Sequence, residues 1–170
     1  MTKEITIRPI TYDDTEDIIR WRNSDFVRSR FIDQRLFTKE SHEYWLKNFV
    51  ETGKVAQFII LLDKKSVGSV YLKDINREEK SAEYGIFIGD ENAIGIGVGT
   101  KSARLILEYA FNELKLEKVY LRAYKDNACA LKSYEKAGFV YKGKTESIEV
   151  NGEKRDIVFM ELEKKDFEKR

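Results

Sequence analysis

The chain has 170 residues, 42% of them hydrophobic and 12% aromatic, which is enough for one domain with a substantial core. Its 31 Lys and Arg nearly balance 30 Asp and Glu, and the net charge of +1 excludes an overall field that would favour nucleic acid or an anionic membrane. One cysteine, Cys129, excludes an internal disulfide, and with one histidine, His42, the chain offers little for a metal. We therefore expect a single cytoplasmic domain, 1–170, without a metal, a membrane anchor or a secretion signal.

The first third of the chain predicts a strand followed by two helices. Residues 4–10 alternate polar and apolar side chains, which is typical of a strand. Apolar residues at helical spacing then predict a short helix over 14–23 and a second helix from the N-cap Thr38 to about Gly53. Residues 24–37, between the helices, show no clear period.

The middle of the chain predicts a meander that leads into a crossover. Three strand patterns, over 56–62, 66–75 and 82–88, are joined by short connections, as in an antiparallel meander. A long amphipathic helix over 98–114 then precedes a strand over 118–124. Because strand, helix and strand of this length usually form a parallel right-handed crossover, we expect strand 118–124 beside strand 82–88.

The last quarter of the chain adds a helix and a hairpin. The helix is predicted to begin at Asp126-Asn127 and to end at Ala137, where Gly138 is a typical terminator. Two strands joined by Asn151-Gly152 complete the chain. The predicted class is α+β with a mixed sheet.

The stretch from Ser81 to Thr100 points to a ligand. A strand and a polar loop are followed by three alternate glycines, Gly95, Gly97 and Gly99, at the start of a helix. Glycine allows close backbone approach, and the first amides of a helix are unpaired at the positive end of its dipole. A phosphate or pyrophosphate group is the expected ligand. The spacing G-x-G-x-G differs from the G-x-G-x-x-G of dinucleotide-binding folds.

Two segments carry a family resemblance. Residues 85–100, GIFIGDENAIGIGVGT, resemble the acetyl-CoA motif of the Gcn5-related N-acetyltransferase (GNAT) superfamily, and residues 127–139, NACALKSYEKAGF, resemble its N…Y-E-K-x-G-F signature, especially in the RimJ/RimL-like branch. The resemblance implies a mixed, mostly antiparallel sheet flanked by helices and open between its fourth and fifth strands. It also implies acetyl-CoA as the cosubstrate. The sequence departs from the family at Ile94 and Ile96, where a polar or aromatic residue and a basic residue are usual.

Donor binding can be assigned residue by residue on this resemblance. The backbone amides of residues 96–100 are expected to bind the pyrophosphate, and the end of the preceding strand to pair with the pantetheine arm. Asn127 is expected to hydrogen-bond that arm, although it is also a typical N-cap. The expected donor-binding residues are Phe87, Ile88, Gly89, Ile96, Gly97, Val98, Gly99, Thr100 and Asn127.

Acetyl transfer from a thioester to an amine also needs an acid and a base. Tyr134 lies seven residues after Asn127, on the same helix face, and its phenol is protonated at neutral pH, which suits donation to a leaving thiolate. Glu83 is the candidate base, directly or through water. Their structural alternatives are a core tyrosine and a salt-bridged strand carboxylate. Cys129 is interpreted as a packing residue.

Only the N-terminal third of the chain can indicate the acceptor, and it leaves the identity of the acceptor undecided. Trp21, Arg22, Arg28 and His42 are candidate acceptor contacts, with core or surface positions as the alternatives. Together with Val27 and Phe31, this pattern resembles branch members that acetylate nucleotide-linked amino sugars, and Arg30 is a further cation that could bind a phosphorylated acceptor. The same segment could instead close over a peptide N-terminus. A polyamine would require an acidic pocket, for which Asp33, Glu40 and Glu43 are candidates.

We conclude that the sequence predicts an N-acetyltransferase that moves the acetyl group directly from acetyl-CoA to a primary amine. The alternative is a non-catalytic acyl-CoA sensor of the same fold, which the retention of Asn127 and Tyr134 disfavours. The expected partners are a small-molecule or peptide amine, with no nucleic acid or membrane, and the expected assembly is a monomer or homodimer.

Overall fold

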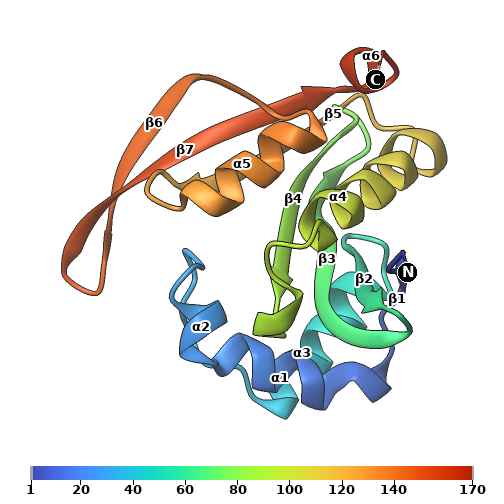
Figure 1. The fold of residues 1–170 in the computed structure, drawn as a ribbon, viewed down its shortest axis with the longest axis vertical. Coiled ribbons are helices and arrows are strands. Elements are labelled where there is room, and N and C mark those ends of the chain that lie inside the picture. The colour runs from blue at the N-terminus through green and yellow to red at the C-terminus, as the bar shows by residue number, and fades with distance from the viewer. Residues whose placement is uncertain (1, 170) are drawn as a thin grey trace.

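In the computed structural model, which describes residues 2–169, all strands belong to one seven-stranded sheet (Figure 1). The sheet order is β1-β2-β3-β4-β5-β7-β6, and only β4 and β5 pair in parallel. The strands are β1 (Ile5–Pro9), β2 (Ala56–Leu62), β3 (Lys65–Asn76), β4 (Ser81–Ile88), β5 (Lys118–Tyr124), β6 (Val140–Val150) and β7 (Glu153–Glu163). The predicted α+β class and the parallel β4–β5 neighbours are confirmed.

The helices lie in two groups. Figure 1 shows α4 and α5 running across one side of the sheet, and α1, α2 and α3 gathered at the lower end of the view. The helices are α1 (Thr15–Asn23), α2 (Asp25–Arg28), α3 (Lys39–Trp45), α4 (Val98–Glu108), α5 (Ala128–Ala137) and α6 (Lys164–Phe167). Both α3 and α4 continue into a wider π-helical turn, Leu46–Val50 and Tyr109–Glu113 respectively. The pattern that predicted a helix over 98–114 therefore covers both parts of a continuous element, whereas α2 and α6 were not predicted.

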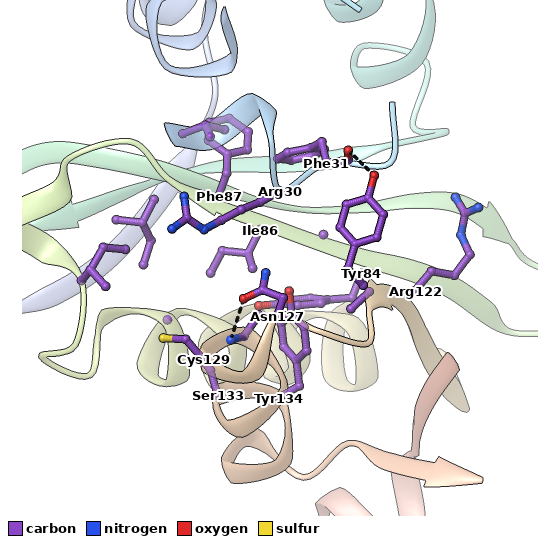
Figure 2. A pocket seen from close by; sticks show the side chains of 18 of the residues that line it. Arg30, Phe31, Tyr84, Ile86, Phe87, Arg122, Asn127, Cys129, Ser133 and Tyr134 are labelled. Atoms are coloured by element: carbon purple, nitrogen blue, oxygen red, sulfur yellow. Dashed lines mark hydrogen bonds between the residues drawn. The ribbon is translucent and has the colours of Figure 1, made fainter. Parts of the chain in front are cut away.

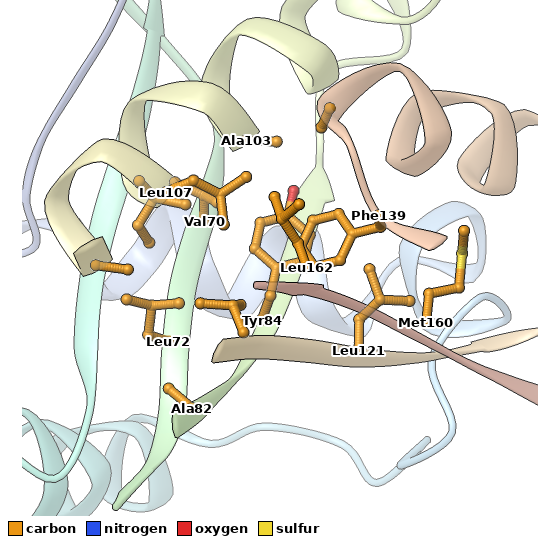
Figure 3. Packing of buried hydrophobic residues seen from close by; sticks show 14 of the residues in the cluster. Val70, Leu72, Ala82, Tyr84, Ala103, Leu107, Leu121, Phe139, Met160 and Leu162 are labelled. Atoms are coloured by element: carbon orange, nitrogen blue, oxygen red, sulfur yellow. The ribbon is translucent and has the colours of Figure 1, made fainter. Parts of the chain in front are cut away.

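Each group of helices covers its own apolar core. The larger core packs Ala103 and Leu107 of α4 against Val70 and Leu72 of β3 (Figure 3). The smaller core lies on the opposite face and contains Ile18 and Trp21 of α1 together with Phe87 of β4. Successive side chains of a strand point to opposite faces, so β4 contributes to both cores. No helix within residues 2–169 is long and apolar enough to cross a membrane.

The sheet opens in its centre. Strands β4 and β5 are hydrogen-bonded only from Ser81 to Glu83, opposite Lys118 to Tyr120. Beyond those residues β4 continues to pair with β3 and β5 continues to pair with β7, so the two strands separate while each keeps its other neighbour. The opening predicted between the fourth and fifth strands is confirmed, and the N-terminal ends of α4 and α5 flank it.

Candidate active site

A cavity of about 490 Å³ occupies the opening between β4 and β5. Its lining comes from four parts of the chain that are distant in the sequence. They are α2 with the loop that follows it, β3 and β4, the glycine loop with the start of α4, and the end of β5 with α5. Figure 2 shows side chains from these elements pointing toward one space, with Arg30 and Phe31 on one side and Ser133 and Tyr134 on the other. The geometry provides one pocket with two ends.

The glycine loop shapes the end of the cavity next to α4. Gly95 and Gly97 have φ angles of +77° and +89°, and an added Cβ at either position would meet no atom within 4 Å. Gly97 is the N-cap of α4, a helix of 11 residues, and the first amides of a helix have no partner inside it. The sequence thus places unpaired N–H groups beside open space, which is the arrangement that binds phosphate.

Six of the nine residues predicted to bind the donor line the cavity. These are Phe87, Ile88, Gly97, Gly99, Thr100 and Asn127. Gly89 lies elsewhere, because its N–H donates to the Val67 carbonyl at 2.8 Å and the Trp21 ring occupies the space over its Cα. The Val98 side chain is buried in the larger core, and Ile96 is directed to solvent. For Ile96 and Val98, the prediction that remains is that their backbone N–H groups bind the pyrophosphate.

Helix α5 supplies the polar groups on the same side. Asn127 is both an N-cap and a lining residue, since its Oδ1 accepts from the Ala130 N–H at 3.4 Å while its side chain faces the cavity. Two turns later, the Tyr134 ring meets the rings of Tyr84 and Phe139 edge-on, at 5.8 and 6.3 Å between centroids. Burial raises the pKa of Tyr134 well above its usual value. Its hydroxyl therefore remains protonated throughout the neutral range.

Glu83 lines the cavity from the end where β4 and β5 still pair. Its carboxylate accepts from Arg122 Nε at 2.9 Å and from Arg122 Nη2 at 3.3 Å, and it pairs with Lys73 Nζ at 3.2 Å. The side chain is buried, so these are not solvent-screened surface pairs. The salt-bridged alternative for Glu83 is therefore present, and the carboxylate still faces the cavity.

The four residues predicted to contact the acceptor lie outside this lining. Trp21 is buried in the smaller core. Arg22 is only 7% exposed, and its guanidinium stacks on the Phe31 ring at 3.5 Å. Arg28 donates from Nε to the Gln34 carbonyl at 2.7 Å, so it braces the loop that follows α2.

His42 is also buried, with 1% of its surface exposed. The alternative of a surface histidine is thus wrong, and the reason is that α3 packs this face against the smaller core. Both ring nitrogens are buried without a hydrogen-bond partner in the described chain, and burial lowers the pKa of His42 to about 4. The ring is neutral at physiological pH.

Six residues of α2 and the segment after it line the cavity opposite α5: Phe26, Val27, Arg30, Phe31, Ile32 and Asp33. Of these, the sequence had indicated Val27, Arg30, Phe31 and Asp33 as possible acceptor contacts, whereas Phe26 and Ile32 were missed. Tyr124 fixes this segment to β5, because its hydroxyl donates to the Phe31 carbonyl at 2.9 Å. The segment lies within residues 24–37, which show no clear period, so its helix α2 and the position of Phe26 and Ile32 on the cavity could not be predicted.

The fold, the glycine loop and the Asn–Tyr pair together define an acyl-CoA-dependent acyltransferase. Residues 4–140 match the family model described as "Acetyltransferase (GNAT) domain", and the chain belongs to this family. It is an N-acetyltransferase with acetyl-CoA as cosubstrate. Among residues 2–169 no three His, Cys, Asp or Glu side chains cluster as metal ligands would.

Relatives with known activities cover most of the chain. Spermidine N(1)-acetyltransferase of Escherichia coli K12 is 28% identical over 92% of this chain and 84% of its own length. The crystal structure of spermidine N-acetyltransferase from Vibrio cholerae with CoA and spermine has a TM-score of 0.88 and 26% identity, covering 96% of this chain and 97% of that one. A dodecameric structure of the Vibrio enzyme, with a TM-score of 0.79 and 25% identity, covers 94% and 93%. A monomer or homodimer stays a prediction for the present chain.

The glycine loop yields a test of donor binding. Gly97→Val should weaken acetyl-CoA binding more than tenfold in calorimetry, because a branched side chain would enter the open space beside the helix amides. Gly152→Val is the matched control: Gly152 has a φ of +81° and equally open space, but it lies in the β6–β7 turn outside the cavity lining. Equal affinity of the two variants, at comparable loss of Tm, would contradict phosphate binding at this loop.

Proposed function

We propose that the protein transfers an acetyl group directly from acetyl-CoA to the primary amine of a small molecule that carries an acidic group. The observation that carries this proposal is a single cavity that joins the glycine loop and Tyr134 to a basic, aromatic acceptor side. The donor would enter along α4 and α5, and the amine would enter past α2. Both would meet where β4 and β5 separate.

The reaction needs no covalent enzyme intermediate. The neutral amine attacks the thioester carbonyl carbon, the C–N bond forms, and the carbonyl electrons move onto oxygen. When the tetrahedral intermediate collapses, the C–S bond breaks and the Tyr134 O–H protonates the leaving thiolate. The proton lost by the amine leaves toward Glu83 or solvent. The products are an amide and free CoA.

Glu83 suits the role of a base that acts through water. A carboxylate can accept about four hydrogen bonds; Arg122 donates two to Glu83, and Lys73 forms an ion pair with the same carboxylate. An acceptor position is left for a water molecule that links the carboxylate to the amine. The two cations also fix the carboxylate in place, which preserves the geometry of that relay.

The charge of the cavity favours an acceptor with an acidic group. Five basic side chains line the cavity against two acidic ones, Asp33 and Glu83, and two of the five, Lys73 and Arg122, are the partners of Glu83. Both acids are already paired: Asp33 binds Arg35 at 2.7 Å, which lowers the pKa of its carboxyl to about 2, and Glu83 binds Arg122 and Lys73. Lys132 and Lys136, on α5, lie on the donor side, whereas Arg30 lies on the acceptor side over the Phe26 ring. A nucleotide-linked amino sugar has the required phosphate and amine.

A polyamine is the second candidate, because both enzymes described above, from Escherichia coli and Vibrio cholerae, are named for spermidine. A polycation would need unpaired carboxylates along the acceptor side, and the two acids there are paired. The resemblance to the RimJ/RimL-like branch is compatible with either acceptor. Because acetyl-CoA is an intracellular metabolite, we place the reaction in the cytoplasm.

Tyr134→Phe tests the acid. The ring packing against Tyr84 and Phe139 is kept and only the O–H is lost, so acetyl-CoA affinity should be unchanged. General acid catalysis contributes about 10²- to 10⁴-fold, and kcat should fall by an amount in that range. Since burial raises the Tyr134 pKa above its usual value, deprotonation of Tyr134 should not lower the wild-type rate in the pH range where an ordinary tyrosine ionises. A loss of affinity equal to the loss of rate would make the hydroxyl a binding contact instead.

Glu83→Gln tests the base. The amide keeps the size of the side chain and cannot take a proton, so kcat/KM should fall, and the loss should be greatest at the pH where the wild-type value is highest. Glu161→Gln is the control, because Glu161 is also an ion-paired strand carboxylate, bound to Lys142 at 2.9 Å, but lies outside the cavity lining. An unchanged pH profile in Glu83→Gln would assign deprotonation to solvent alone.

The acceptor class is tested with a panel of amines at fixed ionic strength. We expect a nucleotide-linked amino sugar to have a higher kcat/KM than spermidine or a peptide N-terminus. Arg30→Gln should raise the KM for the phosphate-bearing amine about tenfold or more, because a hydrogen bond to a charged group contributes about 1.5–3 kcal/mol. Arg20→Gln, on α1 outside this cavity, is the control. A higher kcat/KM for spermidine would reverse the assignment.

A further inference from the structure

Tyr84 has a buried hydroxyl that the reaction described so far does not use. The residue is 4% exposed, and its Oη has no hydrogen-bond partner in the described chain. It also lines the cavity, one residue beyond Glu83, where the pairing of β4 with β5 ends. Tyr84 therefore stands at the start of the opening, with its hydroxyl shielded from bulk water.

A buried hydroxyl without a partner costs free energy that a phenylalanine of the same shape would avoid. The ring alone explains the packing, because it contacts the Phe139 ring at 5.4 Å and the Tyr134 ring at 5.8 Å. The oxygen contributes nothing to that packing. Because the residue lines the cavity, a ligand bound there is a candidate for the missing partner.

The neighbours of Tyr84 identify which part of a ligand it would meet. Tyr84 and Tyr134 meet edge-on, at 86° between ring planes, so both phenols occupy the donor side of the opening. Figure 2 shows Asn127, Tyr84 and Tyr134 around the same part of the cavity. Tyr134 is assigned to the thioester sulfur, and the carbonyl oxygen is bonded to the carbon next to that sulfur. A second phenol beside Tyr134 is thus within reach of the carbonyl group.

We propose that Tyr84 is a further catalytic residue, whose O–H donates a hydrogen bond to the carbonyl oxygen of the bound acetyl thioester. This inference rests on the proposed function. When the amine attacks, the carbonyl electron pair moves onto that oxygen, and the Tyr84 hydroxyl stabilises the developing negative charge. Tyr84 keeps its proton throughout, while Tyr134 gives its proton to the thiolate. The two phenols therefore act on different atoms of one thioester.

The first experiment needs no amine. Acetyl-CoA labelled with ¹³C at the thioester carbonyl is bound to wild-type protein, and the carbonyl stretch is recorded by isotope-edited infrared spectroscopy. A hydrogen bond to the oxygen lowers this frequency, so the band should move up in Tyr84→Phe. Tyr109→Phe is the matched control, because Tyr109 packs on Phe58 in the larger core and lies outside the cavity lining. An unchanged band in Tyr84→Phe would overturn the proposal.

The second experiment measures turnover with the best amine. Removal of one oxyanion donor costs about 10²- to 10³-fold in kcat, and Tyr84→Phe should show such a loss with unchanged acetyl-CoA affinity and an undiminished Tm. Because the two phenols act on different atoms, the losses in Tyr84→Phe and Tyr134→Phe should multiply in the double variant. A double variant no slower than Tyr134→Phe alone would overturn the direct contact and make Tyr84 a positioning residue for Tyr134.

Two outcomes separate this inference from the proposed function. If wild-type protein acetylates an amine and Tyr84→Phe has the same kcat, only the role of Tyr84 is lost. If wild-type protein binds no acetyl-CoA, the proposed function fails, and the role of Tyr84 fails with it.

Discussion

The separation of β4 from β5 is the constraint on which the rest of the structure depends. The two strands pair in parallel from Ser81 to Glu83, and then each follows its other neighbour. A buried strand edge must find partners for its N–H and C=O groups, and here one edge of β4 is left facing a cavity. An extended, amide-containing ligand arm can supply those partners in the way that an added strand does. The opening therefore leaves part of the β4 edge without a strand partner, and the same unpaired edge allows a ligand to bind there.

The alternation of side chains along β4 divides the site into two chemistries. Tyr84 belongs to the larger core with α4, whereas Phe87 belongs to the smaller core with α1. Gly85 lies between them, and the Tyr71 ring occupies the space where its Cβ would be, at 2.3 Å. In the proposed reaction, the phenols of Tyr84 and Tyr134 face the donor, while the ion pairs of Glu83 and the aromatic rings of the smaller core face the acceptor. Because successive side chains of a strand point to opposite faces, β4 alone would fix the position of the donor side relative to the acceptor side.

Similarity to known enzymes and the charges that line the cavity favour different acceptors. The fold is shared with enzymes named for spermidine, but a fold supports many substrates and the acceptor is selected by the side chains that face it. In this chain the facing charges are mostly basic, and Asp33 and Glu83 are paired within the protein. A cation entering this cavity would meet repulsion that an anionic group would not. The contrast also explains why the identity of a relative is a weaker guide to the acceptor than to the donor.

The sequence by itself determined the strands, the longer helices, the glycine loop and most of the expected donor contacts, because these depend on signals that are local in the chain. Strand 118–124, the Asn127 N-cap and the Gly138 terminator follow from periodicity and capping within a few residues. Only the tertiary structure decided the acceptor side. Arg22 and His42 are polar residues that the sequence favours at a surface, yet packing of α1 and α3 on the sheet buries them. Arg30, Phe31 and Tyr84 face the cavity because segments distant in the chain meet at the opening, and no local pattern encodes such a meeting.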